Sequence, residues 1–367
     1  MCCKPILLAV FLIALQTSAE AAEVRHFSFA YDQPHTTAYG IAADTFADML
    51  QKLSDGTMVI DQFPGAQLGQ EPQVLQKLRT GDIDFAITST ANSATVQPES
   101  GIFSIHFVFR SEDHLKKALA DPAVVAAFTE MMNSKVEGAH TLALGTMGFR
   151  DIYSKHEIHR LDDIKNVKVR VQATATEDTM FPAYGAQTIH MPFGDVYTSL
   201  QTGVIDAAEN GINVYQMNKH YEVAPIMSLT EHEANNNVIW VSDKVWNSLS
   251  DEQKRWVQAA ADEVGRTMPE KALGLEHESM ARLEKIGVKF VKDVDKSGFI
   301  KDAEPLQDKL TQQLGPGAEK VLQLVRKASS RVVSTLPRWS RRRPGRMAEM
   351  DTALRRCDET ASILVQS

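Results

Sequence analysis

One phrase occurs twice in the sequence, as LRTGDIDFA at residues 78–86 and as LQTGVIDAA at residues 200–208. In both copies a segment with the apolar spacing of a helix precedes the glycine, and a short apolar run follows it. Glycine tolerates the left-handed backbone conformation that often ends a helix. Each copy therefore predicts a helix that stops at a glycine, followed by a buried strand. The repetition favours two similar α/β lobes.

The segments around the first copy alternate between strand and helix periodicity. We expect strands at 24–31, 57–64 and 83–89, and helices at 38–53 and 71–80. This β-α-β-α-β order builds a parallel sheet with helical crossovers, so the N-terminal lobe is predicted to be α/β.

The same alternation returns around the second copy. The expected strands are 140–147, 166–172, 187–192, 204–210 and 235–242, and the expected helices are 177–184, 193–202 and 250–287. The last helix is the longest. Ser250 and Gln253 form a capping-box pattern at its start, and Pro269 predicts a kink within it. A helix of this length is suited to brace both lobes.

The first 22 residues are predicted to be a secretory signal peptide. They contain Lys4, ten apolar residues from Ile6 to Leu15, and small residues around the expected cleavage site at Ala21 or Ala22. Ten apolar residues are too few to span a bilayer core of about 30 Å. We therefore expect export as a soluble protein, and a buried N-terminal helix is the alternative.

Charge separates the body of the chain from its C-terminal end. The full chain has a formal net charge of -8, whereas residues 328–367 hold eight arginines and four acidic residues and therefore carry +4. Since the signal peptide is neutral, the body carries -8 less +4, or -12, and such a surface disfavours nucleic acid. We expect 328–367 to be an atypical, poorly ordered basic tail. It holds Cys357, the one cysteine after the signal peptide, so the body has no disulfide or thiol nucleophile.

The segment NVKVRVQ at 166–172 places an arginine on one face of a strand. Side chains alternate along a strand, so Arg170 points away from the valines beside it. A solvated edge strand is the alternative interpretation. Arg150 follows one predicted strand and Asn210 ends another, where ligands of open α/β sheets bind. A guanidinium can hold a carboxylate by two parallel hydrogen bonds, and an asparagine adds a donor and an acceptor.

Three further residues are weaker candidates. His35 follows the first strand in DQPH, where a loop at the strand end can reach a ligand. Glu71 begins a helix in LGQEP, and stabilisation of the helix dipole explains it at least as well. Phe193 either covers a ligand or belongs to the core.

Motifs of common enzyme classes are missing from the sequence. It contains no G-x-S-x-G, no H-E-x-x-H, and no Walker or Rossmann glycine pattern. The runs HEIH (156–159) and EHE (231–233) contain metal-binding residue types, but neither completes a ligand set. We interpret their histidines as surface residues. The sequence thus predicts no metal ion, no cofactor and no enzymatic activity.

Several motifs together resemble the solute-binding proteins of tripartite ATP-independent periplasmic (TRAP) transporters. The resemblance covers about residues 24–325 and rests on the segments FPGAQLGQEPQVLQKLRTGDIDF, NVKVRVQAT, MPFGDVYTSLQTGVIDAAENG and SDKVWNSLSDEQKRWVQAAA. It implies an α/β fold with a two-lobed periplasmic-binding-protein-like architecture and a long bracing helix across both lobes. It also implies a periplasmic protein, expected to be a monomer, that hands a small organic acid to membrane permease subunits.

Each lobe is expected to combine two stretches of chain. Lobe I comprises 23–148 with 236–275, and lobe II comprises 149–235 with 276–327. The resemblance implies that Arg170 pairs with the ligand carboxylate. The complete set of expected ligand-binding residues is Arg170, Arg150, Asn210, Phe193, Glu71, His35, Ser89, Asn213 and Asn237.

The many polar candidates favour a ligand that carries hydroxyl groups as well as a carboxylate, such as a uronic or other sugar acid. A C4-dicarboxylate is an alternative because two arginines could hold two carboxylates, and a keto acid is another. Two rivals belong to other classes of protein. One is an exported hydrolase or lyase acting on acidic sugars, and the other is the ectodomain of a sensor.

Overall fold

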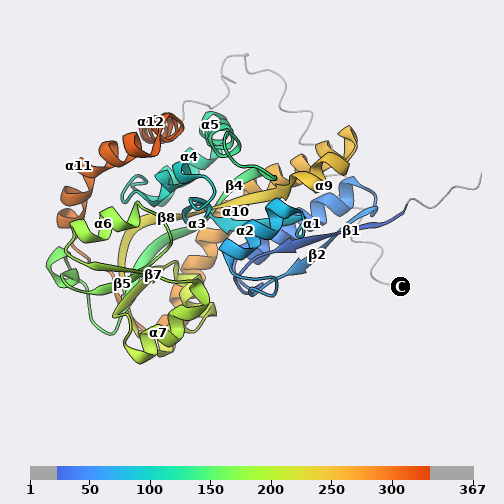
Figure 1. Ribbon diagram of the computed structural model, residues 1–367. Helices are drawn as coiled ribbons and strands as arrows, with labels where there is room; N and C mark the ends of the chain where they lie inside the picture. Colours follow the sequence, from blue (N-terminus) through green and yellow to red (C-terminus); the bar gives the residue numbers. More distant parts are fainter. Residues whose placement is uncertain (1–22, 331–367) are drawn as a thin grey trace, which may run out of the picture. The chain divides into compact units, whose positions relative to one another are not determined.

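The structure is a computed structural model that describes residues 23–330 (Figure 1). The signal peptide expected at 1–22 lies outside the described residues, as does the predicted tail from residue 331 onward. The last helix, α12, runs Pro316–Ser330, so the first three residues assigned to the tail by composition continue this helix. Ala328 is buried, which ties the end of α12 to the core.

The described residues form one mixed sheet with the strand order β2-β1-β3-β8-β4-β7-β5-β6, and β9 pairs with β8. The strands are β1 (Arg25–Ala30), β2 (Met58–Phe63), β3 (Phe85–Ser89), β4 (Ala139–Ser154), β5 (Lys168–Val171), β6 (Gln187–His190), β7 (Ala207–Asn210), β8 (Ile226–Ser242) and β9 (Lys289–Val291). Parallel pairs join β2, β1 and β3 at one end and β7, β5 and β6 at the other. The antiparallel pair of β4 and β8 connects these two α/β units.

Helices cover both faces of the sheet. They are α1 (Ala38–Leu53), α2 (Glu71–Thr80), α3 (Thr90–Ser93), α4 (Glu112–Ala120), α5 (Pro122–Asn133), α6 (Glu177–Ala183), α7 (Val196–Thr202), α8 (Ile212–Met217), α9 (Asp243–Ser248), α10 (Asp251–Lys285), α11 (Ser297–Leu314) and α12, with the 3₁₀ turns η1 (Pro98–Ser104), η2 (Leu161–Ile164), η3 (Phe193–Asp195) and η4 (His220–Glu222). In β3, Phe85 and Ile87 belong to the apolar cluster that contains residues of α1 and α10, whereas Ala86 belongs to the cluster that contains residues of α2, α4 and α5. Burial on both faces explains the continuous apolar sequence of this strand.

The repeated phrase has the same conformation in both places, as predicted. α2 ends at Gly81 with φ 78°, and α7 ends at Gly203 with φ 77°, both in the left-handed region. Leu78 and Leu200, which begin the two copies, are completely buried. The chain then enters the interior strands β3 and β7. The repetition therefore marks equivalent helix-to-strand junctions in the two α/β units.

The two central strands are longer than the sequence predicts. Apolar patterning indicated only 140–147 and 235–242, whereas β4 has 16 residues and β8 has 17. The missed halves contain charged residues such as Arg150 and Glu233, which are buried and lie 3.4 Å apart between Nε and Oε2. The pairing register of β4 and β8 shifts between Thr146 and Phe149.

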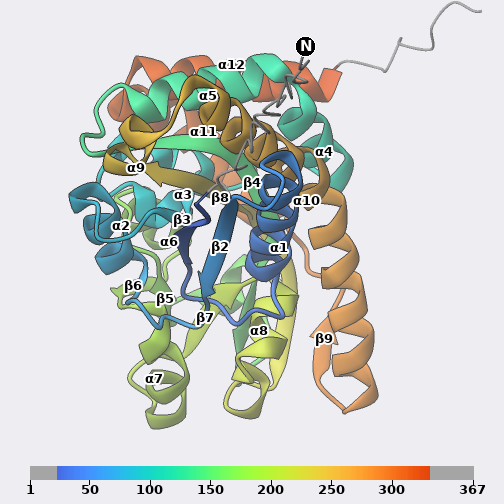
Figure 2. The same ribbon diagram turned by 90° about the vertical axis from the view of Figure 1, so that its right-hand side faces the viewer.

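Helix α10 spans the two α/β units, and Figure 2 shows it extending from the level of α4 to β9. Its 35 residues correspond to about 52 Å at 1.5 Å per residue. As predicted, Ser250 and Gln253 form a capping box at its start, and the helix continues through Pro269. It contacts α1 in one unit, α8 in the other and β4 between them. The expected bracing helix is confirmed.

Candidate ligand-binding site

Polar strand ends and helix starts from both units meet in one closed cleft. Its lining residues are Asp32, Gln33, Tyr39, Glu71, Ser89, Asn92, Met147, Arg150, Arg170, Gln172, Phe193, Asn210, Val214 and Asn235. The cleft has a volume of about 20 Å³, which is room for about one water molecule. A neighbouring pocket of about 240 Å³ shares the side chains of Asp32, Glu71, Asn92, Arg170 and Phe193. A larger ligand therefore needs the cleft to open.

Six of the nine residues that the sequence singled out line this cleft. They are Arg170, Arg150, Asn210, Phe193, Glu71 and Ser89. The other three, His35, Asn213 and Asn237, lie elsewhere. These positions locate the predicted residues, whereas their contact with a ligand stays a prediction.

Arg170 is a buried cation without a salt bridge to any described residue. It lies on β5, which β7 and β6 flank, so the alternative of a solvated edge strand is wrong. Its side chain is 2% exposed, and Nε and Nη2 donate to the carbonyl oxygen of Met191 at 3.2 and 3.0 Å. The ring centroid of Phe193 is 5.8 Å from the guanidinium carbon. Burial lowers the pKa of Arg170, although Glu209 counteracts this.

Arg150, in contrast, is already neutralised inside the protein. Nε and Nη2 donate to the carboxylate of Glu209, and Nη1 donates to Oδ1 of Asn235 at 3.0 Å. A second carboxylate, that of Glu233, is 3.4 Å from Nε. Burial favours loss of the proton, but these carboxylates outweigh it and raise the pKa of Arg150. Arg150 thus borders the cleft with its charge already paired.

Glu71 holds one wall of the cleft together. Its carboxylate accepts hydrogen bonds from Tyr39 Oη at 3.0 Å, from Ser89 N and Oγ at 2.9 and 2.6 Å, and from Asn92 Nδ2 at 2.7 Å. The capping box of α2 is made instead by Gln70 and Gln73. The carboxylate of Glu71 therefore links α2 to the end of β3 in addition to lying at a helix start.

The loop after β1 reaches the cleft, but not through the residue that the sequence suggested. Asp32 and Gln33 line the cleft and are buried, whereas His35 is exposed and pairs with Asp44 at 3.0 Å. Burial, and then the negative charge of Glu71, raise the pKa of Asp32 well above its usual value. His35 therefore lies outside the lining, which contains Asp32 and Gln33 of the same loop, because a position after a strand does not specify which loop residue turns inward.

Two of the predicted asparagines, Asn213 and Asn237, lie outside the lining of the cleft. Asn213 donates from Nδ2 to Ser279 Oγ on α10 at 3.1 Å. Asn237 lies opposite Ser89 in the sheet and is completely buried. Asn235, two residues before it on β8, is the one that borders the cleft, where its Nδ2 donates to Asn210 Oδ1 at 2.9 Å. A shift of two positions along a strand keeps the same face, so the sequence could not distinguish them.

Hydrogen bonds cross the cleft between the two α/β units. Gln172 Nε2, beyond the end of β5, donates to Ser89 Oγ at 2.9 Å. Gly194 N donates to Gln70 Oε1 at 3.3 Å, and a further bond at 3.2 Å joins Asn218 to Gln33. Together with the small cleft volume, these bonds show a closed arrangement.

The metal-binding residue types seen in the sequence separate into two groups. His156 and His159 are exposed, as expected. His232 and Glu233 are buried, so the interpretation of His232 as a surface histidine is wrong. Burial lowers the pKa of His232 well below its usual value.

Among residues 23–330 no helix combines the length and apolar character needed to cross a membrane.

Most of the chain is similar in sequence to known solute-binding proteins. Residues 29–313 match the family described as bacterial extracellular solute-binding protein, family 7. The 2,3-diketo-L-gulonate-binding periplasmic protein YiaO of Escherichia coli K12 is 29% identical over 289 residues, which are 78% of this chain and 87% of YiaO.

Two solved structures extend the likeness to the fold. The sugar acid binding protein DctPAm of Advenella mimigardefordensis, in complex with galactonate, has a TM-score of 0.78 at 29% identity, covering 83% of this chain and 99% of that one. A TRAP periplasmic solute-binding protein of a Bradyrhizobium species, in complex with galacturonate, has a TM-score of 0.76 at 30% identity, covering 84% and 100%. The α/β fold is thus that of the two-lobed TRAP binding proteins. The chain belongs to bacterial extracellular solute-binding protein family 7, the solute-binding proteins of TRAP transporters.

Proposed function

We propose that this protein binds a sugar acid with one carboxylate, through Arg170, by closure of its two lobes. The observation that carries the proposal is the state of the Arg170 guanidinium. It is 2% exposed, and no described residue forms a salt bridge with it. A buried cation is costly unless an anion accompanies it, and a ligand carboxylate accepts its fork of donors in a planar, bidentate pair.

The rest of the cleft suits the hydroxyl groups of such a ligand. Asp32 and Glu71 offer carboxylate oxygens, which accept hydrogen bonds from hydroxyl groups. Asn92, Asn210 and Gln172 offer both donors and acceptors. Phe193 presents an aromatic ring beside Arg170, suited to the apolar face of a sugar ring. The ligands of the relatives, galactonate, galacturonate and 2,3-diketo-L-gulonate, each carry one carboxylate and several hydroxyl groups.

The alternatives require features that the cleft lacks or uses otherwise. A C4-dicarboxylate needs a second free cation, but Arg150 is bound by Glu209 and Asn235. A short keto acid has no hydroxyl group to donate to the carboxylate of Asp32, which lines the cleft. Members of the matched family bind solutes, so we propose a binding role and no catalysis for this chain. A sensor ectodomain would use the same site, and genomic neighbourhood distinguishes it from a transport protein.

The remaining expectations complete the proposal. The protein acts in the periplasm as a monomer after signal cleavage near Ala21 or Ala22, and it delivers its ligand to the permease subunits of a TRAP transporter. Lobe I comprises 23–148 with 236–275, and lobe II comprises 149–235 with 276–327. The boundaries at 148/149 and 235/236 coincide with the register shift between β4 and β8, where Thr146 faces Asn236 and Phe149 faces Ala234. A hinge is favoured there because the ladder is already interrupted.

A thermal-shift screen tests this function. The probes are D-galacturonate and D-galactonate, with D-galactose as a neutral control, succinate as a dicarboxylate and pyruvate as a keto acid. A ligand at a hundred times its dissociation constant stabilises the protein by about 2.7 kcal/mol, which raises the melting temperature measurably. We expect shifts with one or both sugar acids and none with galactose. A shift with succinate or pyruvate alone, or with no organic acid at all, would contradict the proposal.

A further inference from the structure

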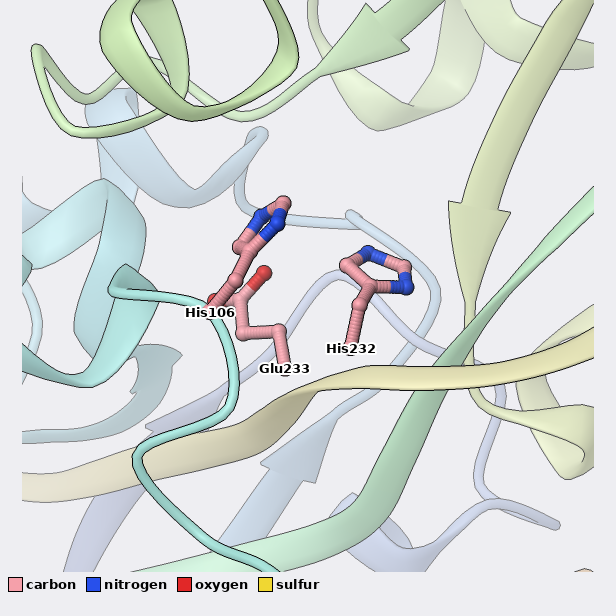
Figure 3. Close-up of side chains that lie close together, drawn as sticks. All are labelled: His106, His232 and Glu233. Atoms are coloured by element: carbon pink, nitrogen blue, oxygen red, sulfur yellow. The ribbon is translucent and has the colours of Figure 1, made fainter. Parts of the chain in front are cut away.

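A second group of buried side chains does not border the cleft, but one of its members, Glu233, lies 3.4 Å from Nε of Arg150. It consists of His106, His232 and Glu233, whose ligand atoms lie within 4.8 Å of one another. The three residues are 0%, 1% and 3% exposed. Figure 3 shows His232 and Glu233 rising from neighbouring positions of β8 toward His106, which comes from the loop after η1.

The backbone is distorted to bring these side chains together. Neighbouring residues of a regular strand point to opposite faces, but β8 is irregular before Glu233. The β4–β8 register passes from Arg150 opposite Glu233 to Ile152 opposite Ser228. Glu231 within this irregularity has φ 43°, and Phe107 beside His106 has φ 58°. Such conformations are unfavourable for residues other than glycine and concentrate at functional sites.

Unpaired polar atoms point into the same place. Among the described residues, Nε2 of His106 and Nε2 of His232 have no hydrogen-bond partner, and Oε2 of Glu233 and Oε2 of Glu177 have none unless a proton is shared between these two carboxylates. The other nitrogen of each ring is occupied. Nδ1 of His106 contacts the Tyr184 hydroxyl at 3.0 Å, and Nδ1 of His232 contacts that of Thr230 at 2.8 Å. With Nδ1 donating to these hydroxyls, each Nε2 presents a lone pair, as metal-binding histidines do.

Charge balance points to a cation as well. Glu177 approaches Nε2 of His106 to 3.4 Å, and Glu209 approaches Nε2 of His232 to 3.8 Å. When Glu177, Glu209 and Glu233 are ionised, Arg150 offsets one of their three charges, which leaves -2. Buried charges require compensation. One divalent cation supplies it, and two bound protons are the competing solution.

We propose that His106, His232 and Glu233 bind a divalent transition-metal ion, with Glu177 as a fourth ligand. Two imidazoles with carboxylates suit Zn²⁺, which prefers four ligands in a tetrahedron. Bonds of about 2.1 Å place tetrahedral ligand atoms about 3.4 Å apart. The His106–Glu177 distance already has this value, and the ligand atoms of His106, His232 and Glu233, which lie within 4.8 Å of one another, must approach by at most about 1.4 Å. The ion would hold β8, the loop after η1 and α6 together behind Arg150.

The first test measures the binding of Zn²⁺ to the full chain, which is prepared without a polyhistidine tag. Metal is removed with a chelator, and Zn²⁺ is returned in a calorimetric titration and in a thermal melt. We expect one equivalent to bind and to raise the melting temperature, and the chelator to reverse the rise. Binding of Co²⁺ at the same site should give the visible absorption of a four-coordinate ion. Absence of stoichiometric binding, with a melting temperature indifferent to Zn²⁺, would overturn the proposal in favour of bound protons.

Variants locate the site. His106→Gln should weaken Zn²⁺ binding at least tenfold, whereas the control His156→Gln/His159→Gln, on exposed residues, should not. Thr230→Val removes only the hydroxyl that orients His232 and should cost about ten- to a hundredfold in affinity, as losses of such supporting partners do. If His106→Gln does not fold, the Zn²⁺ affinity of Thr230→Val and the Co²⁺ spectrum decide whether the metal ion binds at this site. Zn²⁺ affinity that falls in the exposed-histidine control but not in the other variants would mean adventitious surface binding and refute the assignment.

Discussion

The guanidinium of Arg150 and the carboxylate of Glu209 form a buried pair that uses both Nε and Nη2. Both side chains are 1% exposed. Arg170 lies opposite Ala208 in the β5–β7 pair, and within residues 23–330 the carbonyl oxygen of Met191 is the one hydrogen-bond acceptor of its guanidinium. The two arginines of the cleft therefore differ in what they can do. The charge of Arg150 is paired inside the protein, whereas no described carboxylate forms a salt bridge with Arg170.

Removing the internal partner should be costly. Glu209→Gln leaves Arg150 with a weakened pair, and breaking a buried ion pair typically costs 3–5 kcal/mol. We expect about 3 kcal/mol, the lower end, because Glu233 remains 3.4 Å from Nε. The free energy of unfolding by urea measures the loss. The control Glu278→Gln removes an exposed pair with Arg282 and should cost less than about 1 kcal/mol. Equal losses in the two variants would refute the distinction.

The glycine of the repeated phrase gives a second prediction. Gly203 has φ 77°, and a Cβ added to it meets no atom within 4 Å, so Gly203→Ala changes only backbone strain. Holding alanine in the left-handed conformation costs roughly 1–2 kcal/mol. Gly274 in α10 is the matched control, since its added Cβ is equally unobstructed and its φ is helical. Gly274→Ala should stabilise the protein by about 0.5–1 kcal/mol. Urea unfolding that gives both variants the same sign would contradict the conformational argument.

Protonation of a buried histidine beside the cleft should destabilise the fold in acid. Burial, and then the positive charge of Arg170, lower the pKa of His220 from 6.5 to about 3. Between these values the unfolded chain binds a proton that the folded chain does not, so stability falls as pH falls below about 6.5. From about pH 7.5 to about pH 5 the loss from this residue is about 2 kcal/mol.

His220→Asn isolates this contribution. Asparagine retains a polar group for the hydroxyl of Tyr153, which contacts Nδ1 of His220 at 2.7 Å. The packing cost of the substitution is read at about pH 7.5, where the histidine is neutral in both states. The further loss on acidification, followed by urea unfolding at each pH, should be about 2 kcal/mol smaller in the variant. The same pH dependence in both proteins would show that His220 does not titrate as expected.

The sequence was most informative where one local pattern decides the structure. Apolar spacing and capping predicted α1 and α2 to the residue, and the glycine rule predicted the ends of α2 and α7. Strand alternation predicted correctly that Arg170 and Gln172 face away from the core valines. These features depend on neighbours within a few positions, which the sequence displays directly.

The features that were missed depend on partners far along the chain. The polar half of β8 is buried and pairs with β4, where Glu233 lies opposite Arg150, some eighty residues earlier in the chain. Asp32 lines the cleft and His35 does not, because the loop after β1 turns in one particular direction. The periodicity of the sequence carries no information about the direction of that turn. Likewise, Arg150 looks identical to Arg170 in sequence, and only the position of Glu209 shows that its charge is paired.

The most direct test of the account is calorimetric titration of Arg170→Gln with the sugar acid that stabilises the wild-type protein, D-galacturonate being the first probe. Removal of one partner of a buried charge pair costs 2–5 kcal/mol, so affinity should fall about thirtyfold to a few thousandfold. The methyl ester of the same acid, which has no charge, should bind the wild type and the variant with similar weak affinity. Undiminished affinity of the folded Arg170→Gln variant for the free acid would contradict the central claim.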